Sequence, residues 1–186
     1  TERDRVLTED EIRELYRKMP DAGLLQSTEL AVWIALSTCC RIGELSQAKW
    51  EHIDLEKRQW LIPAENSKNG KPHTVYLSAI AESSFRKLKA LPGESVWCYP
   101  GRNDGEPVSP KSITKQLKDR QRRSDDERIA GRSSKQGALL LPGGLWTPHD
   151  LRRTAATMMV ALGILPEVAE RCLNHTEENK IKRIYQ

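Results

Sequence analysis

A proline-initiated helix in the last third of the chain limits the folds open to it more than any other segment does. It starts at Thr147–Pro148: a threonine hydroxyl suits the N-cap, and proline suits the first helical position, where its missing N–H has no partner anyway. Asp150 lies in the first turn, where a carboxylate complements the positive end of the helix dipole. The following residues, 155–162, are mostly apolar, and Gly163 suits a left-handed helix end. The pattern predicts a helix with one buried side.

Side chains able to do chemistry gather at the start of this helix. His149 and Arg152 are three residues apart, and Arg153 is four from His149, so the three share one face. An imidazole titrates near neutral pH, and a guanidinium beside free helix N–H groups can hold an anion. The pattern favours phosphate chemistry. The alternative is a surface helix whose histidine and arginines are only solvated.

Length and composition predict one domain over residues 1–186. A chain of 186 residues is long enough for its own core, and 38% hydrophobic with 30% charged residues is typical of a globular protein in water. No segment is apolar for long enough to cross a bilayer. The four cysteines have neither zinc-ligand spacing nor the density of a disulfide scaffold, which favours a reducing cytoplasm.

Positive charge is concentrated in one segment. The net charge is +4, but residues 111–135 alone carry nine basic and four acidic side chains. Ser109–Pro110 starts a predicted helix there, with Ile113 and Leu117 on its inner face and lysines outside. A basic stripe can follow a phosphate backbone, although a solvated helix face would look the same. Residues 124–146 are charged and rich in Ser and Gly, which predicts a flexible loop.

Two more helices are predicted from their first residues. Thr8 begins a capping box with Glu11, and the helix that follows stops at Pro20. Ser78 caps a helix that reaches about residue 91, with Ile80 among its buried positions. The first of these two helices is interpreted as structural.

A third helix, over 28–40, is apolar on all sides and is therefore predicted to be buried, with Ser27 as its cap and both Cys39 and Cys40 inside it. Arg41 follows at once. An arginine at the end of a buried helix needs an anionic partner. Glu44 is one candidate for that partner, and a phosphate is the other.

A small sheet is predicted between these helices. Residues 60–62 and 74–77 are β-prone, and Asn69–Gly70 between them is a strong hairpin signal. Residues 52–55 supply a third strand. Lys68 and Lys71 then lie at the hairpin tip, where a lysine ordinarily serves only solubility. The expected fold class is mixed α+β, mainly helical, with a small antiparallel sheet of about three strands.

The last segments are a short helix over 166–173, with Val168, Ala169 and Cys172 predicted to point inward, and the sequence Leu173–His175 that ends it. Taken alone, that histidine would be an ordinary capping residue, and Tyr185 ten residues later would be a packing residue.

Taken in order, these segments resemble the tyrosine recombinases, the phage integrase family. Residues 149–157 resemble the His-x-x-Arg box of that family. Residues 38–45 resemble its first-arginine box, Thr-Gly-x-Arg-x-x-Glu-Leu, with Cys39 in place of the usual glycine. Residues 173–175 resemble its Leu-Gly-His box, with Asn174 in place of glycine, and asparagine also tolerates a left-handed turn. Tyr185 stands at the spacing of the nucleophile.

The resemblance runs from about Thr8 to Gln186. It implies the catalytic-domain fold of DNA breaking-rejoining enzymes, as a fragment without the amino-terminal core-binding and arm domains and without the segment after Tyr185. Within the family, the residues of these motifs are most similar to those of the integrases of temperate phages and genomic islands. The catalytic residues that it implies are Arg41, Lys68 (with Lys71 as the alternative), His149, Arg152, His175 and the nucleophile Tyr185. The expected DNA-binding residues are Lys71, Lys111, Lys115, Lys118, Arg122, Arg123 and Arg153.

The expected chemistry is a transesterification in which Tyr185 attacks a phosphodiester. Arg41 and Arg152 offer paired donors to the non-bridging oxygens, and His175 offers one more. His149 accepts the phenolic proton, and Lys68 protonates the leaving 5′ oxygen. The product is a 3′-phosphotyrosine link that a second DNA end can reverse. No carboxylate cluster suited to Mg²⁺ is visible, so neither a metal nor another cofactor is expected.

The partners that the resemblance implies are double-stranded DNA attachment sites and further copies of the chain, in a tetramer on two duplexes. It leaves room for an accessory DNA-bending or excision protein. The expected location is on DNA in the cytoplasm of a bacterial host, with no membrane contact. Two alternatives stay open: a DNA-binding or assembly module without strand cleavage, and an activity like that of a type IB topoisomerase. A metal nuclease would need clustered acidic ligands.

Overall fold

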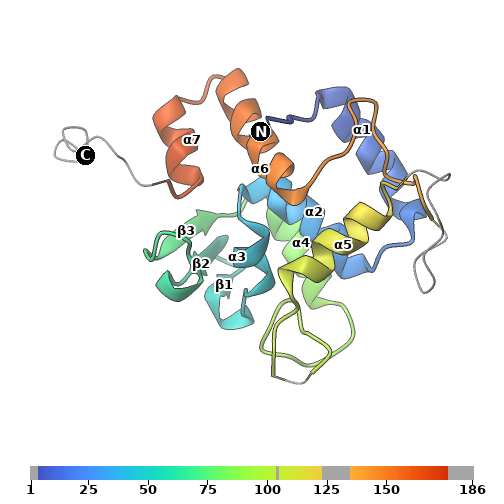
Figure 1. The fold of residues 1–186 in the computed structure, drawn as a ribbon. Coiled ribbons are helices and arrows are strands. Elements are labelled where there is room, and N and C mark those ends of the chain that lie inside the picture. The colour runs from blue at the N-terminus through green and yellow to red at the C-terminus, as the bar shows by residue number, and fades with distance from the viewer. Residues whose placement is uncertain (1–3, 104, 123–134, 176–186) are drawn as a thin grey trace.

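A helical body with a three-stranded sheet at one side makes up the computed structural model, which describes residues 4–103, 105–122 and 135–175 (Figure 1). The predicted fold class is confirmed. The helices are α1 (Glu9–Lys18), α2 (Gln26–Thr38), α3 (Ile42–Ser46), α4 (Ala79–Lys89), α5 (Pro110–Asp119), α6 (Pro148–Ala161) and α7 (Pro166–Cys172). The strands are β1 (Ile53–Asp54), β2 (Gln59–Ile62) and β3 (His73–Tyr76), and the 3₁₀ helices are η1 (Met19–Ala22), η2 (Trp50–His52) and η3 (Ala64–Asn66).

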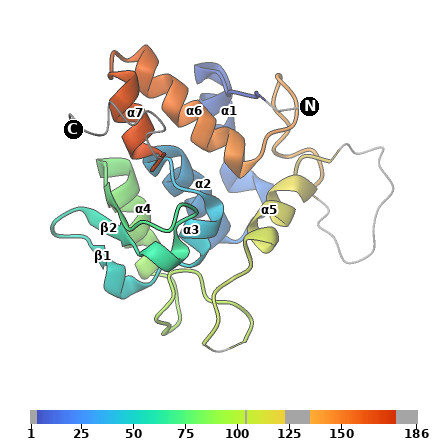
Figure 2. The ribbon, with the colours of Figure 1, turned by 60° about the vertical axis from the view of Figure 1, so that its left-hand side comes forward.

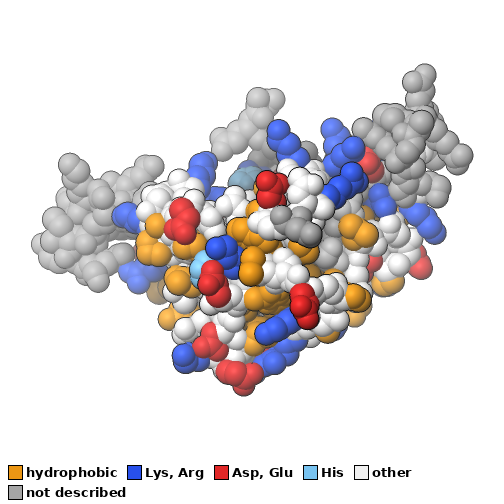
Figure 3. Space-filling model, turned by 90° about the horizontal axis from the view of Figure 1, so that it is seen from below, with side chains coloured by type: hydrophobic (Ala, Val, Ile, Leu, Met, Phe, Trp, Pro, Cys, Tyr) orange, Lys and Arg blue, Asp and Glu red, His pale blue; other side chains and the backbone are white. Residues whose placement is uncertain are grey.

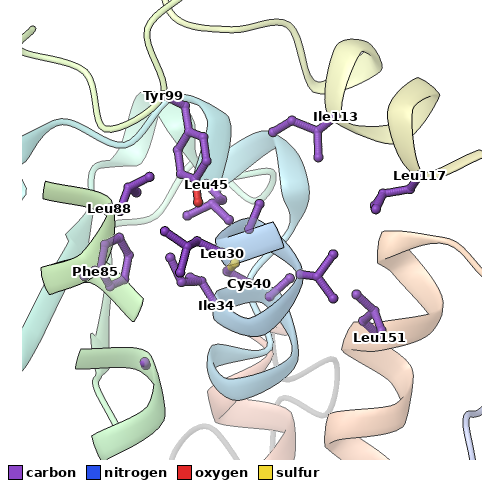
Figure 4. Packing of buried hydrophobic residues seen from close by; sticks show 14 of the residues in the cluster. Leu30, Ile34, Cys40, Leu45, Phe85, Leu88, Tyr99, Ile113, Leu117 and Leu151 are labelled. Atoms are coloured by element: carbon purple, nitrogen blue, oxygen red, sulfur yellow. The ribbon is translucent and has the colours of Figure 1, made fainter. Parts of the chain in front are cut away.

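Helix α2 forms the centre of the core and packs against both α4 and α6. Figure 4 shows Leu30 and Ile34 of α2 between Phe85 of α4 on one side and Leu151 of α6 on the other. All four side chains are buried. Burial of a large aliphatic or aromatic side chain contributes about 1.5–3 kcal/mol. This packing therefore fixes α6, which carries Arg152, against α2, whose end leads into the segment with Arg41.

The sheet is antiparallel in the order β1-β2-β3. Trp60 lies opposite Val75, and Ile62 lies opposite His73. The Trp60 ring meets Phe85 of α4 edge-on, with 5.6 Å between ring centroids. This aromatic pair anchors the sheet to the helical body, and the β2–β3 connection extends from it toward α7 (Figure 1).

Local caps start the helices where the sequence predicts. The Thr8 capping box of α1 and the Ser78 cap of α4 are confirmed. At α6 the Thr147 hydroxyl accepts the Asp150 N–H at 3.3 Å, and Asp150 Oδ2 accepts the Thr147 N–H at 2.8 Å. Gly163 after this helix has the left-handed φ of 89°. The helix that carries His149 and Arg152 is therefore anchored at its first turn.

The boundaries predicted for the buried helix are wrong at both ends. Helix α2 begins at Gln26 with Leu25 as N-cap, so Ser27 lies inside it. It ends at Thr38, and Cys39 after it turns left-handed with φ 56°. An apolar composition conceals these ends, because tertiary contacts and not a polar cap set them.

Three residues predicted to face inward do not. Ile80 on α4 is 64% exposed, Val168 on α7 is 45% exposed, and Cys172 is also exposed. Helix α7 is short and meets α6 along one edge, so that Ala169 is its buried residue. Figure 2 shows α6 and α7 side by side, with α2 next to them.

Of the loop predicted over 124–146, the structure describes residues 135–146. Leu139 and Trp146 there are buried. The Trp146 N–H donates to Gln121 Oε1 at 2.7 Å, and the Gly143 N–H donates to Glu11 Oε1 at the same distance. These contacts join the entry to α6 to the ends of α1 and α5. In the described part of the chain, no helix is long and apolar enough to cross a membrane.

Candidate active site

Arg41 is placed at the start of α3 by an ion pair with its own helix. Its guanidinium donates to Glu44 Oε1 at 2.8 Å, while its backbone N–H donates to Glu44 Oε2 at 2.8 Å. Glu44 is buried, and the Arg41 side chain keeps 23% of its surface exposed. The anionic partner that the sequence demands is therefore Glu44. The carboxylate holds one Nη of a guanidinium that stays partly accessible to solvent.

Arg152 is buried on α6, with 4% of its surface exposed. Its Nη1 donates to the carbonyl of Cys39, and its Nη2 donates to the carbonyl of Leu173. Burial lowers the pKa of Arg152, and the nearby charge of Arg41 lowers it further. Arg152 thus ties together the ends of α2 and α7 and lies close to Arg41. The structure brings the two arginines of the predicted site together.

His149 lies one turn before Arg152 on α6. His149 is exposed, but the partial desolvation of its ring lowers its pKa, and the charges of Arg153 and Arg152 lower it further against the opposing effect of Asp150. The lowered pKa favours the neutral imidazole, the form that is able to accept a proton. Arg153 itself pairs with Asp150 at 3.2 Å. One face of α6 thus holds a neutral base beside fixed positive charge.

The hairpin places Lys68 in an exposed position in the β2–β3 connection. The next residue, Asn69, accepts the Lys71 backbone N–H at 3.0 Å, which shapes the turn. Lys71 is also exposed. Both lysines therefore lie on the same turn, and the geometry of the turn does not separate them.

His175 follows α7 and is paired with a carboxylate on that helix. Its ring Nδ1 lies 2.5 Å from Glu170 Oε2, and its backbone N–H donates to the Glu170 carbonyl at 3.1 Å. Asn174 before it has a left-handed φ of 50°, as the sequence predicts for this position. His175 stands two residues after the carbonyl that Arg152 holds. This contact links the predicted Leu-Asn-His segment to the arginines.

Sequence reasoning missed His73, at the start of β3. Its half-buried ring lies within the electrostatic reach of Glu44, Arg152 and Arg41, and the backbone of Cys172 raises its pKa against the effect of burial. Burial lowers the pKa of His73. Only its position opposite Ile62 in the sheet brings it to the site, and no motif marks it.

The predicted DNA-binding residues are only partly described. Lys111, Lys115 and Lys118 are exposed on α5, whose Ile113 and Leu117 are buried. Arg122 is half-buried. Lys and Arg side chains gather along the upper edge of the face shown in Figure 3. Two predicted residues, Arg123 and the nucleophile Tyr185, lie outside the described residues.

Among the residues that are described, no three His, Cys, Asp or Glu side chains are grouped so as to hold a metal ion.

Comparison with known proteins gives one family. A model of the phage integrase family matches residues 5–186. Among curated proteins, the prophage integrase IntA of Escherichia coli (strain K12) is 28% identical over 177 residues, which cover 95% of this chain and 38% of that protein. The tyrosine recombinase XerA of Pyrococcus furiosus is 26% identical over 91% of this chain and 52% of its own. The chain thus spans about half or less of the length of these relatives.

Solved structures share the fold. A lambda integrase tetramer bound to a Holliday junction has a TM-score of 0.68 at 20% identity, over 97% of this chain and 49% of that one. A crystal structure of XerA recombinase has a TM-score of 0.67 at 17% identity, over 97% of this chain and 62% of that one.

Proposed function

As the chain belongs to the phage integrase family, we propose that it is the catalytic domain of a site-specific recombinase that breaks and rejoins DNA through a 3′-phosphotyrosine intermediate. One observation carries the proposal: Arg152 is fixed where α2, α6 and α7 converge, within electrostatic reach of Arg41, and both arginines lower the pKa of His149. Paired donors next to a base suit a phosphodiester whose charge grows during attack.

The reaction needs one proton taken and one given. The phenolic oxygen of Tyr185 attacks the phosphorus as His149 accepts its proton. Arg41 and Arg152 hold the two non-bridging oxygens, and His175 adds a donor. The bond to the 5′ oxygen breaks, and this oxygen takes a proton from Lys68. The product is a phosphotyrosine diester, so a 5′ hydroxyl from another DNA end can reverse the step without an external energy source.

The wider role follows from the same chemistry. We assign it to integration or excision of a prophage or genomic island, on DNA in a bacterial cytoplasm. The similarity to prophage integrases supports this assignment. Exchange of two duplexes needs four cleavages, which four copies of the chain supply. An accessory DNA-bending or excision protein fits this scheme as a further partner.

The test is covalent trapping by the full-length protein on a nicked duplex that carries the attachment core. Diffusion of the short nicked product away from the duplex prevents religation, so the phosphotyrosine adduct accumulates and is seen on a denaturing gel. We expect an adduct in EDTA that is absent from Tyr185→Phe and present in Tyr76→Phe, a control at an exposed tyrosine of β3.

Other results point elsewhere. Binding of this DNA without an adduct leaves a DNA-binding module. An adduct accompanied by supercoil relaxation but no strand exchange between two sites indicates a topoisomerase-like activity. Disappearance of the adduct in EDTA contradicts the metal-independent mechanism.

A further inference from the structure

A closed ring of hydrogen bonds joins the lysine hairpin to the end of α7. Asn69 Nδ2 donates to the carbonyl of Asn174 at 2.9 Å and to its Oδ1 at 3.0 Å. Asn174 Nδ2 donates back to Ser67 Oγ at 2.9 Å. Ser67 Oγ in turn donates to Asn69 Oδ1 at 2.8 Å. These three side chains, here called the clasp, connect two segments that are 105 residues apart in sequence.

The side chains of the clasp are hydrogen-bonded and partly shielded from solvent. Ser67 is buried, and both asparagines are half-buried. Each amide hydrogen of Asn69 has an acceptor within Asn174, and Asn69 Oδ1 also accepts the Lys71 N–H. Hydrogen bonds that are partly withdrawn from water hold their partners more firmly than exposed ones. The turn is therefore fixed against α7 by direct contacts.

The two ends of the clasp touch residues of the proposed reaction. On the hairpin side, Ser67 and Asn69 are the neighbours of Lys68 on either side. On the other side, Asn174 stands between Leu173, whose carbonyl Arg152 holds, and His175. The Cys172 backbone also raises the pKa of His73 of β3 against the effect of burial, so β3 comes close to the end of α7 at the same junction. Lys68 is thus linked to Arg152 and His175 through Asn174.

From this geometry we infer that the clasp positions Lys68 for proton transfer to the leaving 5′ oxygen, and that Asn69 and Asn174 are positioning residues for that step. The inference rests on the proposed function. A lysine side chain is long and rotatable, so only a fixed backbone limits the volume that its ammonium samples. A displacement of about 1 Å at a reacting group can cost about 100-fold in rate.

The decisive measurement compares two leaving groups in single-turnover cleavage by the full-length protein. One substrate is ordinary DNA, and the other has sulfur in place of the bridging 5′ oxygen. A thiol has a pKa of about 8.5, far below that of an alcohol, so it leaves without a proton donor. A defect confined to proton donation therefore disappears on the sulfur substrate, while a general structural defect persists.

The variants are Asn174→Gly and Asn69→Ala. Glycine accepts the left-handed φ of position 174 and so removes only the amide. We expect each variant to cleave ordinary DNA about 10- to 100-fold more slowly, and to come within a few-fold of the wild-type rate on the sulfur substrate. Lys68→Ala is expected to behave in the same way.

Two controls frame the result. Asn66→Ala removes another hairpin amide, which donates to the Gln47 carbonyl at 3.3 Å and does not belong to the clasp, so it should cleave both substrates at nearly the wild-type rate. Arg41→Ala removes a phosphate contact and should remain slow on both substrates.

The inference is overturned if the clasp variants are equally slow on both substrates, or if they cleave ordinary DNA at the wild-type rate. If the sulfur substrate restores the cleavage rate of Lys71→Ala and not that of Lys68→Ala, then Lys68 is not the proton donor. If the wild-type protein forms no adduct on either substrate, the proposed function fails, and this inference fails with it. If the wild-type protein forms the adduct but the sulfur substrate does not restore the rate of the clasp variants, the inference fails and the proposed function stands.

Discussion

At position 39, cysteine occupies a backbone conformation that favours glycine. Its left-handed φ of 56° turns the chain out of α2, and its carbonyl accepts Nη1 of Arg152. The glycine usual in the family's first-arginine box suits such a turn, since a side chain there costs about 1–2 kcal/mol. The thiol is buried against Ala155 and Leu173, and burial raises its pKa to about 11. Cysteine at this position therefore combines backbone strain with a small apolar contact.

We expect Cys39→Gly to be more stable than Cys39→Ala by about 1 kcal/mol. Both variants lack the thiol, but only glycine relieves the left-handed backbone. Urea denaturation of the two proteins gives the difference directly. Equal midpoints would show that the turn at position 39 carries no strain.

The pH dependence of cleavage tests His149 as the base. Because partial desolvation and the charges of Arg153, Arg152 and Arg41 lower the pKa of His149, its imidazole takes up a proton only at a pH below about 6.5, the ordinary value. The single-turnover rate should therefore rise with pH along a limb centred below about pH 6.5. Removal of one positive charge by Arg153→Gln raises the pKa of His149, so the limb should move to higher pH.

The control for this shift is Arg13→Gln, an exposed arginine of α1 that pairs with Glu9. It should leave the limb in place. A limb that Arg153→Gln moves to lower pH, or does not move, contradicts the assignment of His149 as the titrating base.

At the scale of elements, α1 is attached to the entry of α6 through one carboxylate. Glu11 accepts Arg5 Nη2 at 2.5 Å and Nη1 at 2.9 Å, the Thr8 N–H at 3.0 Å and the Gly143 N–H at 2.7 Å. These donors, with that of Arg5 foremost, lower the pKa of Glu11 from 4.5 to about 2. A single side chain thus caps its own helix and fixes a loop 132 residues away in sequence.

The lowered pKa of Glu11 predicts an acid-sensitive part of the folding stability. A carboxyl group with a folded pKa near 2 and an ordinary pKa of 4.5 stabilises the fold fully above pH 4.5, and its contribution disappears as the pH falls to about 2. The difference corresponds to about 3 kcal/mol. Urea denaturation from about pH 6 to about pH 2 should show this decrease in the wild type.

Glu11→Gln should be less stable than the wild type near neutral pH and should lack this part of the pH dependence. Glu9→Gln is the matched control, because Glu9 is exposed on the same helix. If the free energy of unfolding falls equally in Glu11→Gln and the wild type between pH 4.5 and about 2, the acid-sensitive group is another one.

At the scale of the whole molecule, the lysines of α5 test how the domain binds DNA. Removal of one lysine–phosphate interaction should lower the slope of log affinity against log salt by about 0.9. The triple variant Lys111→Gln, Lys115→Gln and Lys118→Gln should therefore bind duplex DNA more weakly and with a slope shallower by about 2–3. Fluorescence anisotropy between about 50 and about 200 mM salt measures both quantities.

A matched triple variant changes Arg13, Arg17 and Lys87 to Gln, at the border of an apolar groove between α1, α2 and α4. It removes the same charge and should keep the wild-type slope. Equal slopes for the two triple variants would mean that only the total charge matters and that α5 is not a DNA-binding element.

Local chemistry allowed the fold class, the helix starts and the residue types of the site to be predicted from the sequence. The N-caps at Thr8, Ser78 and Thr147 depend on partners three residues away, and Asn69–Gly70 marks its own turn. Helix ends without such local signals were not predictable: Ser27 was predicted to cap α2 but lies inside that helix. The boxes identify candidate residues because their order is visible in the chain.

Only the tertiary structure decides what those residues do to one another. Arg152 closes the site by holding carbonyls at residues 39 and 173, and the clasp joins Asn69 to Asn174. The lowered pKa of His149 depends on partial desolvation of its ring and on the charges of the three arginines near it. These contacts connect backbone and side-chain groups that many residues separate. No pattern within a few residues encodes them, because packing around α2 creates them.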